Sequence, residues 1–207
     1  MKKTVALIVC LLSLFVVSSC SLFSSKAPLK HYYQVYYQPK KSAAQPIKAT
    51  LRIKTFDADK IYKRYNLVYR TSLEEMFYYN THFWASKPAD MITDLVSNHF
   101  SKRQVFSDII LTIDKKPNYV LSGRILALDE VIEDEKSYAR VAINFELKDY
   151  KTTDVLVAHS FDRKQEVEGK KPVDVVRAMG GIIEEELEVF ISEIYETLGS
   201  AGDGQAD

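Results

Sequence analysis

The most constraining feature of this chain is a regular alternation of apolar and polar residues between Ser137 and Tyr150. One side of an extended backbone there would carry Val141, Ile143, Phe145 and Leu147. The other side would carry Arg140, Asn144, Glu146 and Lys148. Because successive side chains of a strand point to opposite faces, the pattern predicts a long strand with one buried face and one wet face.

Other segments of the chain have the β-branched and aromatic residues that are typical of strands. We expect strands at residues 31–37, 49–56, 66–71, 76–84, 105–113, 119–131 and 155–167. Turns at 72–75 and 149–154 would close two hairpins, and the acidic run Glu133, Asp134 and Glu135 is expected to be a solvated loop. These signals predict about seven or eight strands.

Two segments have the periodicity of helices. The first is expected to begin with Ser86 as N-cap and Pro88 in the first turn, and to end near Lys102 and Arg103. The second runs from about Pro172 to Leu198. Its apolar residues step by three or four: Val176, Met179, Ile183, Leu187, Phe190, Ile194 and Leu198.

The stripe of the second helix indicates packing on the sheet, with a coiled-coil seam as the alternative. Gly180 and Gly181 are costly inside a helix, by about 1 kcal/mol each relative to alanine. They favour a close approach of the helix to the sheet, or else a local kink. The fold class is therefore a single α+β domain: a mixed, mostly antiparallel sheet with two helices packed on one face.

The first twenty residues indicate export and lipid attachment. Lys2 and Lys3 precede an apolar run of about 14 residues, which ends at Val17-Ser18-Ser19-Cys20 and looks like a bacterial lipobox. The alternative is a plain secretory signal with an unrelated cysteine. The lipobox predicts a signal peptide at 1–19, a tether at 20–30, a domain at 31–198 and a flexible tail at 199–207. Cys20 would carry diacylglyceryl and N-acyl groups.

Composition and position restrict the location and the partners. Ser21 follows the lipidated cysteine, which favours the outer over the inner membrane, with the domain on the periplasmic side. The full chain has 28 basic and 28 acidic residues, so nothing in its charge indicates a nucleic-acid partner. Cys20 would be the one cysteine of the mature chain, which excludes a disulfide framework and leaves stability to packing.

No arrangement of residues indicates catalysis or a cofactor. His31, His82, His99 and His159 lack the spacing of metal ligands. The sequence has no nucleophile elbow, no SxxK motif and no phosphate-binding glycine loop. We therefore expect a non-enzymatic protein without metal or cofactor, apart from the covalent lipid.

The segment from Asn66 to Pro88 is unusually aromatic, with bulky rings on both faces of a predicted strand. The conservative interpretation is a strand buried between sheet and helix. The functional interpretation places one face in the core and offers the other to a lipid or a protein. Arg70 lies among these apolar groups, and an arginine in that setting is expected to have a paired charge or a fixed contact.

The order of short motifs in this region resembles the ABC-type transport auxiliary lipoprotein family. The motifs are Tyr32-Tyr33 soon after the cysteine, Tyr69-Arg70 at the end of a strand, an aromatic strand through Tyr79, and Trp84 followed by Pro88. The resemblance spans roughly residues 20–198. Ala85-Ser86-Lys87-Pro88 departs from the Ala-Glu-Pro-Pro that relatives often have, which affects the expected surface contacts.

The resemblance implies a membrane-anchored auxiliary subunit that works with an ABC permease, an ATPase and an MCE-domain protein. The whole system would move lipids or other hydrophobic molecules between membranes. The subunit would form a homo-oligomer if its partner is a ring. The candidate contact residues for a partner or lipid are Tyr69, Arg70, Phe77, Tyr79, Trp84 and Pro88. Two alternatives remain: an adaptor for another envelope machine, such as a cell-wall synthase or secretion pore, and a free lipid carrier.

Overall fold

The computed structural model describes residues 27–40, 45–110, 112, 115–169 and 171–202, and Cys20 with the expected signal peptide lies outside them. The described strands are β1 (His31–Tyr33), β2 (Ile47–Ile53), β3 (Asp57–Ala58), β4 (Asn66–Arg70), β5 (Met76–Trp84), β6 (Phe106–Ile110), β7 (Tyr119–Glu133), β8 (Lys136–Asp149) and β9 (Val155–Glu166). The helical elements are η1 (Lys60–Lys63), α2 (Pro88–Arg103) and α3 (Pro172–Gly202).

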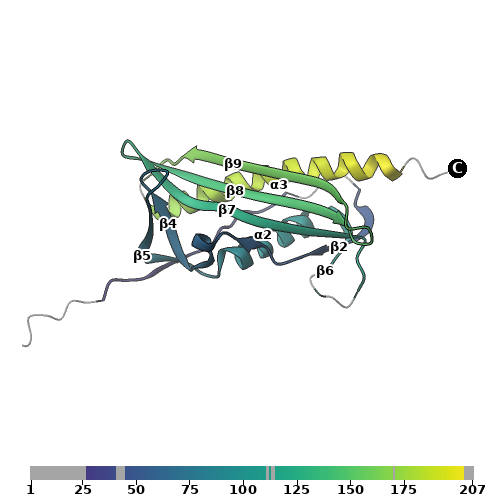
Figure 1. The fold of residues 1–207 in the computed structure, drawn as a ribbon, viewed down its shortest axis with the longest axis horizontal. Helices are drawn as coiled ribbons and strands as arrows, with labels where there is room; N and C mark the ends of the chain where they lie inside the picture. The colour runs from purple at the N-terminus through teal and green to yellow at the C-terminus, as the bar shows by residue number, and fades with distance from the viewer. Residues whose placement is uncertain (1–26, 41–44, 111, 113–114, 170, 203–207) are drawn as a thin grey trace, which may run out of the picture.

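Strand β7 organises the sheet (Figure 1). One of its edges pairs with β8 along almost its whole length, and β8 in turn pairs with β9. The other edge pairs with three shorter strands in succession: β2, β3 and β4. Beyond β4 lie β5 and then β1, so the aromatic strand lies close to one end of the sheet.

The α+β class is confirmed, but the expected strand orientation is wrong. Among the described residues the sheet has nine strands, and five of its eight strand pairings are parallel. The predicted hairpins are present as β4–β5 and β8–β9, and β7–β8 is also antiparallel. The parallel pairings join strands that are distant in sequence, such as β2 with β7, and a pattern of local strand signals does not reveal such crossovers.

Both helices cover the same face of the sheet, which we call the helix face (Figure 1). The Phe145 ring on β8 stacks on Phe190 of α3 at 5.3 Å, and Phe190 contacts Phe100 of α2 at 6.3 Å. The predicted stripe on α3 is buried from Val176 to Ile194. Packing within the domain therefore accounts for this stripe, as the preferred interpretation held.

The segment after β1 leaves the sheet and packs against both helices, so the strand expected at 31–37 ends at Tyr33. Tyr37 is buried, and its hydroxyl lies 3.0 Å from Nδ1 of His99 on α2. A Cβ atom on Gly180 would lie 3.4 Å from the carbonyl oxygen of Tyr36. Gly180 thus permits a close approach, but to this segment and not to the sheet.

Three local expectations also need correction. The N-cap of α2 is Lys87 and not Ser86, because Pro88 occupies the first helical position, where its missing N–H costs no hydrogen bond. The strand expected at 105–113 is shorter in the described residues, Phe106–Ile110. The short strand β3 and the helix η1 gave no signal in the sequence pattern.

Candidate functional site

Four aromatic side chains and one histidine form a row on the helix face near the β1 end of the sheet. We call Tyr33, Tyr69, Phe77, Tyr79 and His82 the aromatic ladder. Tyr69 on β4 lies between Phe77 and Tyr79 of β5, with ring centroids 5.1 and 4.7 Å away. His82 meets the edge of Tyr79 at 5.1 Å and approaches Tyr33 at 5.6 Å. The row therefore spans β4, β5 and β1.

Hydrogen bonds fix the middle and one end of the ladder. The Tyr79 hydroxyl donates to Oε2 of Glu130, a buried residue of β7, at 2.6 Å. Burial and this carboxylate together raise the pKa of Tyr79. The Tyr33 hydroxyl lies 2.8 Å from Nδ1 of His82, and partial burial lowers the pKa of His82. The ladder thus presents neutral rings, with Phe77 37% exposed.

The opposite face of the same strands has a different character. Lys30, Tyr32, Arg64, Tyr78 and Phe83 form what we call the basic–aromatic face. Tyr32 contacts Phe83 at 5.7 Å between centroids, and the Lys30 ammonium lies 5.6 Å from the Phe83 ring centre. The Arg64 guanidinium lies 4.9 Å from the ring centre of Tyr78. Such distances are those of cation–π contacts.

The strand register places these groups on one side of the sheet. Tyr78 lies between Phe77 and Tyr79 on β5, Phe83 follows His82, and Tyr32 precedes Tyr33 on β1. Because successive side chains of a strand point to opposite faces, these three rings lie on the side opposite the aromatic ladder. Tyr32 is paired with Phe83. The two faces of β5 are therefore chemically distinct, one a neutral aromatic row and the other aromatic with cations above the rings.

The structure brings three of the expected contact residues together and removes two from the surface. Tyr69, Phe77 and Tyr79 are neighbours in the aromatic ladder. Trp84 is 1% exposed and Pro88 is also buried, so the expectation that they contact a partner or lipid is corrected. Their apolar side chains belong to the core where β5 meets α2.

Arg70 lies on the face opposite the aromatic ladder, in a buried charged cluster. Its Nε donates to Oδ2 of Asp129 at 2.9 Å, and its Nη2 contacts the same carboxylate oxygen. The Tyr62 hydroxyl donates to that oxygen at 2.7 Å. Burial works to lower the pKa of Arg70, but Asp129 and Tyr62 together outweigh this effect and raise the pKa. The expectation that Arg70 has a paired charge is confirmed.

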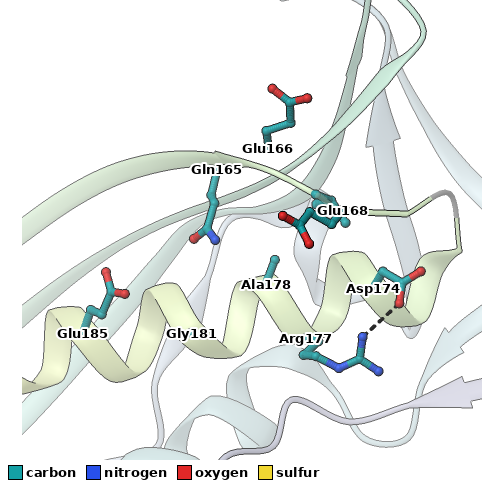
Figure 2. A pocket seen from close by; sticks show the side chains of 9 residues that line it. Gln165, Glu166, Glu168, Asp174, Arg177, Ala178, Gly181 and Glu185 are labelled. Atoms are coloured by element: carbon teal, nitrogen blue, oxygen red, sulfur yellow. Dashed lines mark hydrogen bonds and ion pairs between the residues drawn. The ribbon is translucent and has the colours of Figure 1, made fainter.

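The polar groove shown in Figure 2 lies between the end of β9 and the first turns of α3. Gln165 and Glu168 face α3 across it, while Asp174 accepts a hydrogen bond from Arg177 at 2.9 Å. Carboxylates dominate its lining. Within the described residues no group of three or more histidine, cysteine or acidic side chains is placed to hold a metal ion.

The histidines expected to be structural or surface groups have identifiable contacts. His99 is fully buried between Tyr37 and Glu188, whose Oε1 lies 3.1 Å from Nε2. His159 on β9 lies 2.8 Å from Oε2 of Glu186 on α3. Both imidazoles therefore join elements of the fold.

Sequence reasoning missed two features of this region. Glu130 and Asp129 are consecutive acids in the otherwise apolar run of β7, and this break in the pattern was an available signal of buried polar partners. The basic run from Lys60 to Tyr65 was also not singled out, although it places Arg64 on the basic–aromatic face.

Comparison with solved structures identifies the class of fold. A protein of the DUF330 family from Xanthomonas campestris superposes with a TM-score of 0.69 at 17% identity, covering 85% of this chain and 99% of its own. The crystal structure of an uncharacterized protein gives a TM-score of 0.66 at 12% identity, covering 81% of this chain and 99% of its own. At these identities the similarity establishes the fold alone. The search of curated proteins gave no match.

The sequence itself identifies the family. Residues 33–188 match the ABC-type transport auxiliary lipoprotein component family, and this chain belongs to it. The match includes β4, β5, all residues of the aromatic ladder and the buried Arg70–Asp129 pair. In the part of the chain that the structure describes, no helix has the length and apolar character needed to cross a bilayer.

Proposed function

We propose that this protein is the lipid-anchored, non-catalytic periplasmic subunit of an MCE-type ABC transport system that moves lipids or other hydrophobic molecules between the envelope membranes. Family membership over residues 33–188 is the observation that carries the transport role. The proposal adds the anchor at Cys20, placement at the outer membrane, and partnership with an MCE-domain protein, a permease and an ATPase.

The geometry of the β5 edge supports an interaction role. His31 lies eleven residues after Cys20, and an extended chain of that length reaches at most about 39 Å. The aromatic ladder starts at β1, so it lies at the part of the domain that follows the tether directly. Half-buried aromatic rings with fixed hydroxyls are typical of protein interfaces. We assign the ladder to contact with the transporter.

The test is affinity purification of the full-length tagged protein after crosslinking in cells, followed by mass spectrometry. We expect an MCE-domain protein with its permease and ATPase. The variant Phe77→Ser should reduce their recovery, whereas Val189→Ser, which changes an exposed apolar residue on α3, should not. Recovery of a cell-wall synthase or secretion component in place of the transporter would refute the proposal and favour the adaptor function.

A second readout concerns the transported material. Deletion of the gene should alter the distribution of lipids between the membranes and increase sensitivity to hydrophobic drugs. A lipid that crosses the aqueous space between membranes must stay shielded from water, since each exposed CH₂ costs about 0.8 kcal/mol. Unchanged lipid distribution together with the absence of an MCE partner would end the hypothesis.

A further inference from the structure

The basic–aromatic face combines exposed rings with cations that have no acidic partner. Tyr32 is 65% exposed, and Tyr65, directly after Arg64, is 48% exposed. Lys30 and Arg64 are exposed and make no ion pair within the described residues. The same holds for Lys60 on η1, which adjoins this face because the Tyr78 hydroxyl donates to the carbonyl oxygen of Ile61 at 3.2 Å. The face is therefore an uncompensated positive surface next to wet aromatic rings.

The two acids that precede η1, Asp57 and Asp59, already have basic partners. Asp57 pairs with Lys63 at 2.7 Å, and Asp59 pairs with Arg124 at 2.8 Å. Neither carboxylate is thus available to neutralise Lys30, Lys60 or Arg64. The charge of the face calls for an anionic surface outside the protein.

The position of the face along the chain indicates which anionic surface it meets. Leu29 and Lys30 directly precede β1, and Leu29 is 75% exposed. Ten residues separate Lys30 from Cys20, which is a reach of at most about 36 Å. A domain confined this closely to a membrane meets the headgroups of that membrane at a high effective concentration.

We propose that the basic–aromatic face docks the domain on anionic phospholipid headgroups of the membrane that carries its anchor. Lys30, Lys60 and Arg64 would contact phosphates, and Tyr32 and Phe83 would enter the interfacial layer, where amphipathic rings are favoured. Docking this face leaves the aromatic ladder, on the other side of β5, directed away from the lipid. The inference rests on the proposed anchor, and it adds an orientation that the anchor alone does not impose.

The test uses the mature acylated protein reconstituted in vesicles, with acylation verified by intact mass. Leu29→Cys supplies one free thiol, because Cys20 is acylated, and takes a fluorescent label. Vesicles contain a headgroup-attached quencher in phosphatidylcholine, with or without phosphatidylglycerol. We expect quenching with phosphatidylglycerol at low salt and its loss at 0.5 M salt, where the screening length is about 4 Å.

Charge-reversal variants make the test specific. Each basic residue near an anionic membrane surface raises the ratio of docked to undocked domain about fivefold. Lys30→Glu, Lys60→Glu and Arg64→Glu together should therefore lower this ratio about a hundredfold or more. The matched control reverses three exposed lysines without an ion pair among the described residues: Lys48, Lys116 and Lys151. It should dock as the unaltered protein does.

The outcomes separate this inference from the proposed function. Equal quenching in both kinds of vesicle, or equal losses in the two triple variants, would overturn docking on anionic lipid and favour an acidic protein partner for this face. Absence of the acyl groups by mass would instead contradict the anchor. The purification test above addresses the transporter partners independently.

Discussion

Replacing Arg70 by methionine should destabilise the domain strongly, because it leaves a buried charge without its partner. Asp129 is fully buried, and one of its oxygens accepts hydrogen bonds from both Arg70 and Tyr62. Without the guanidinium, the Tyr62 hydroxyl is the one hydrogen-bond donor to that carboxylate that remains among the described residues. Breaking a buried pair in this way costs about 3–5 kcal/mol, a large part of a typical stability of about 5–15 kcal/mol.

Replacing Asp129 should lower the free energy of unfolding less than replacing Arg70 does. Asp129→Asn keeps a side chain of the same shape and a hydrogen bond with Tyr62, and the Arg70 side chain, 10% exposed, lies beside a surface cavity near Ser72. The guanidinium can therefore turn towards water, and we expect a cost of about 1–3 kcal/mol. The double variant, Arg70→Met with Asp129→Asn, removes both charges. Its loss of stability should therefore be about 2–3 kcal/mol smaller than the sum of the losses in the two single variants.

Urea unfolding followed by the fluorescence of the single tryptophan, Trp84, measures these differences, because that residue is buried in the core. With a slope of about 1–3 kcal/mol per molar urea, Arg70→Met should lower the midpoint by more than 1 M. The control is Arg140→Met, which breaks a more exposed pair with Asp162 that is worth about 0–1 kcal/mol.

Equal midpoints for Arg70→Met and Arg140→Met would show that the buried pair does not stabilise the fold. Additive costs in the double variant would show that the two charges do not interact. If Arg70→Met retained stability but lost the transporter partners, Arg70 would be a contact residue and the structural reasoning would be refuted.

Three further predictions concern the core, the pH dependence and the anchor. Trp84→Ala should cost about 3–5 kcal/mol in the same unfolding assay, since the ring is fully buried; a loss below 1 kcal/mol would contradict core burial. Burial lowers the pKa of His99 below the value of about 6.5 in an unfolded chain, against the opposing effect of Glu188. The unfolded state therefore binds more protons below pH 6.5, so stability should fall as the pH drops through that range, and His99→Gln, unlike His31→Gln, should flatten the dependence. Cys20→Ala should abolish acylation, and palmitate labelling that persisted would contradict the anchor.

Local patterns in the sequence determined much of the fold. The alternation around Phe145 specified a strand buried on one side, and the α3 stripe specified a helix with one apolar face, because both depend only on the period of the backbone. The two hairpins were predictable for the same reason, since their strands are adjacent in sequence. The family resemblance, carried by motifs such as Tyr69-Arg70, is confirmed over residues 33–188.

Only the tertiary structure decided which strands are neighbours and which aromatic residues remain exposed. The β2, β3 and β4 strands all run parallel to β7, which depends on long crossovers that leave no local pattern. A run of rings such as Phe77 to Trp84 looks uniform in sequence. Burial of Trp84 in the core and exposure of Tyr32 follow from what packs on each side of the sheet, because an aromatic side chain suits a core and an interface equally well.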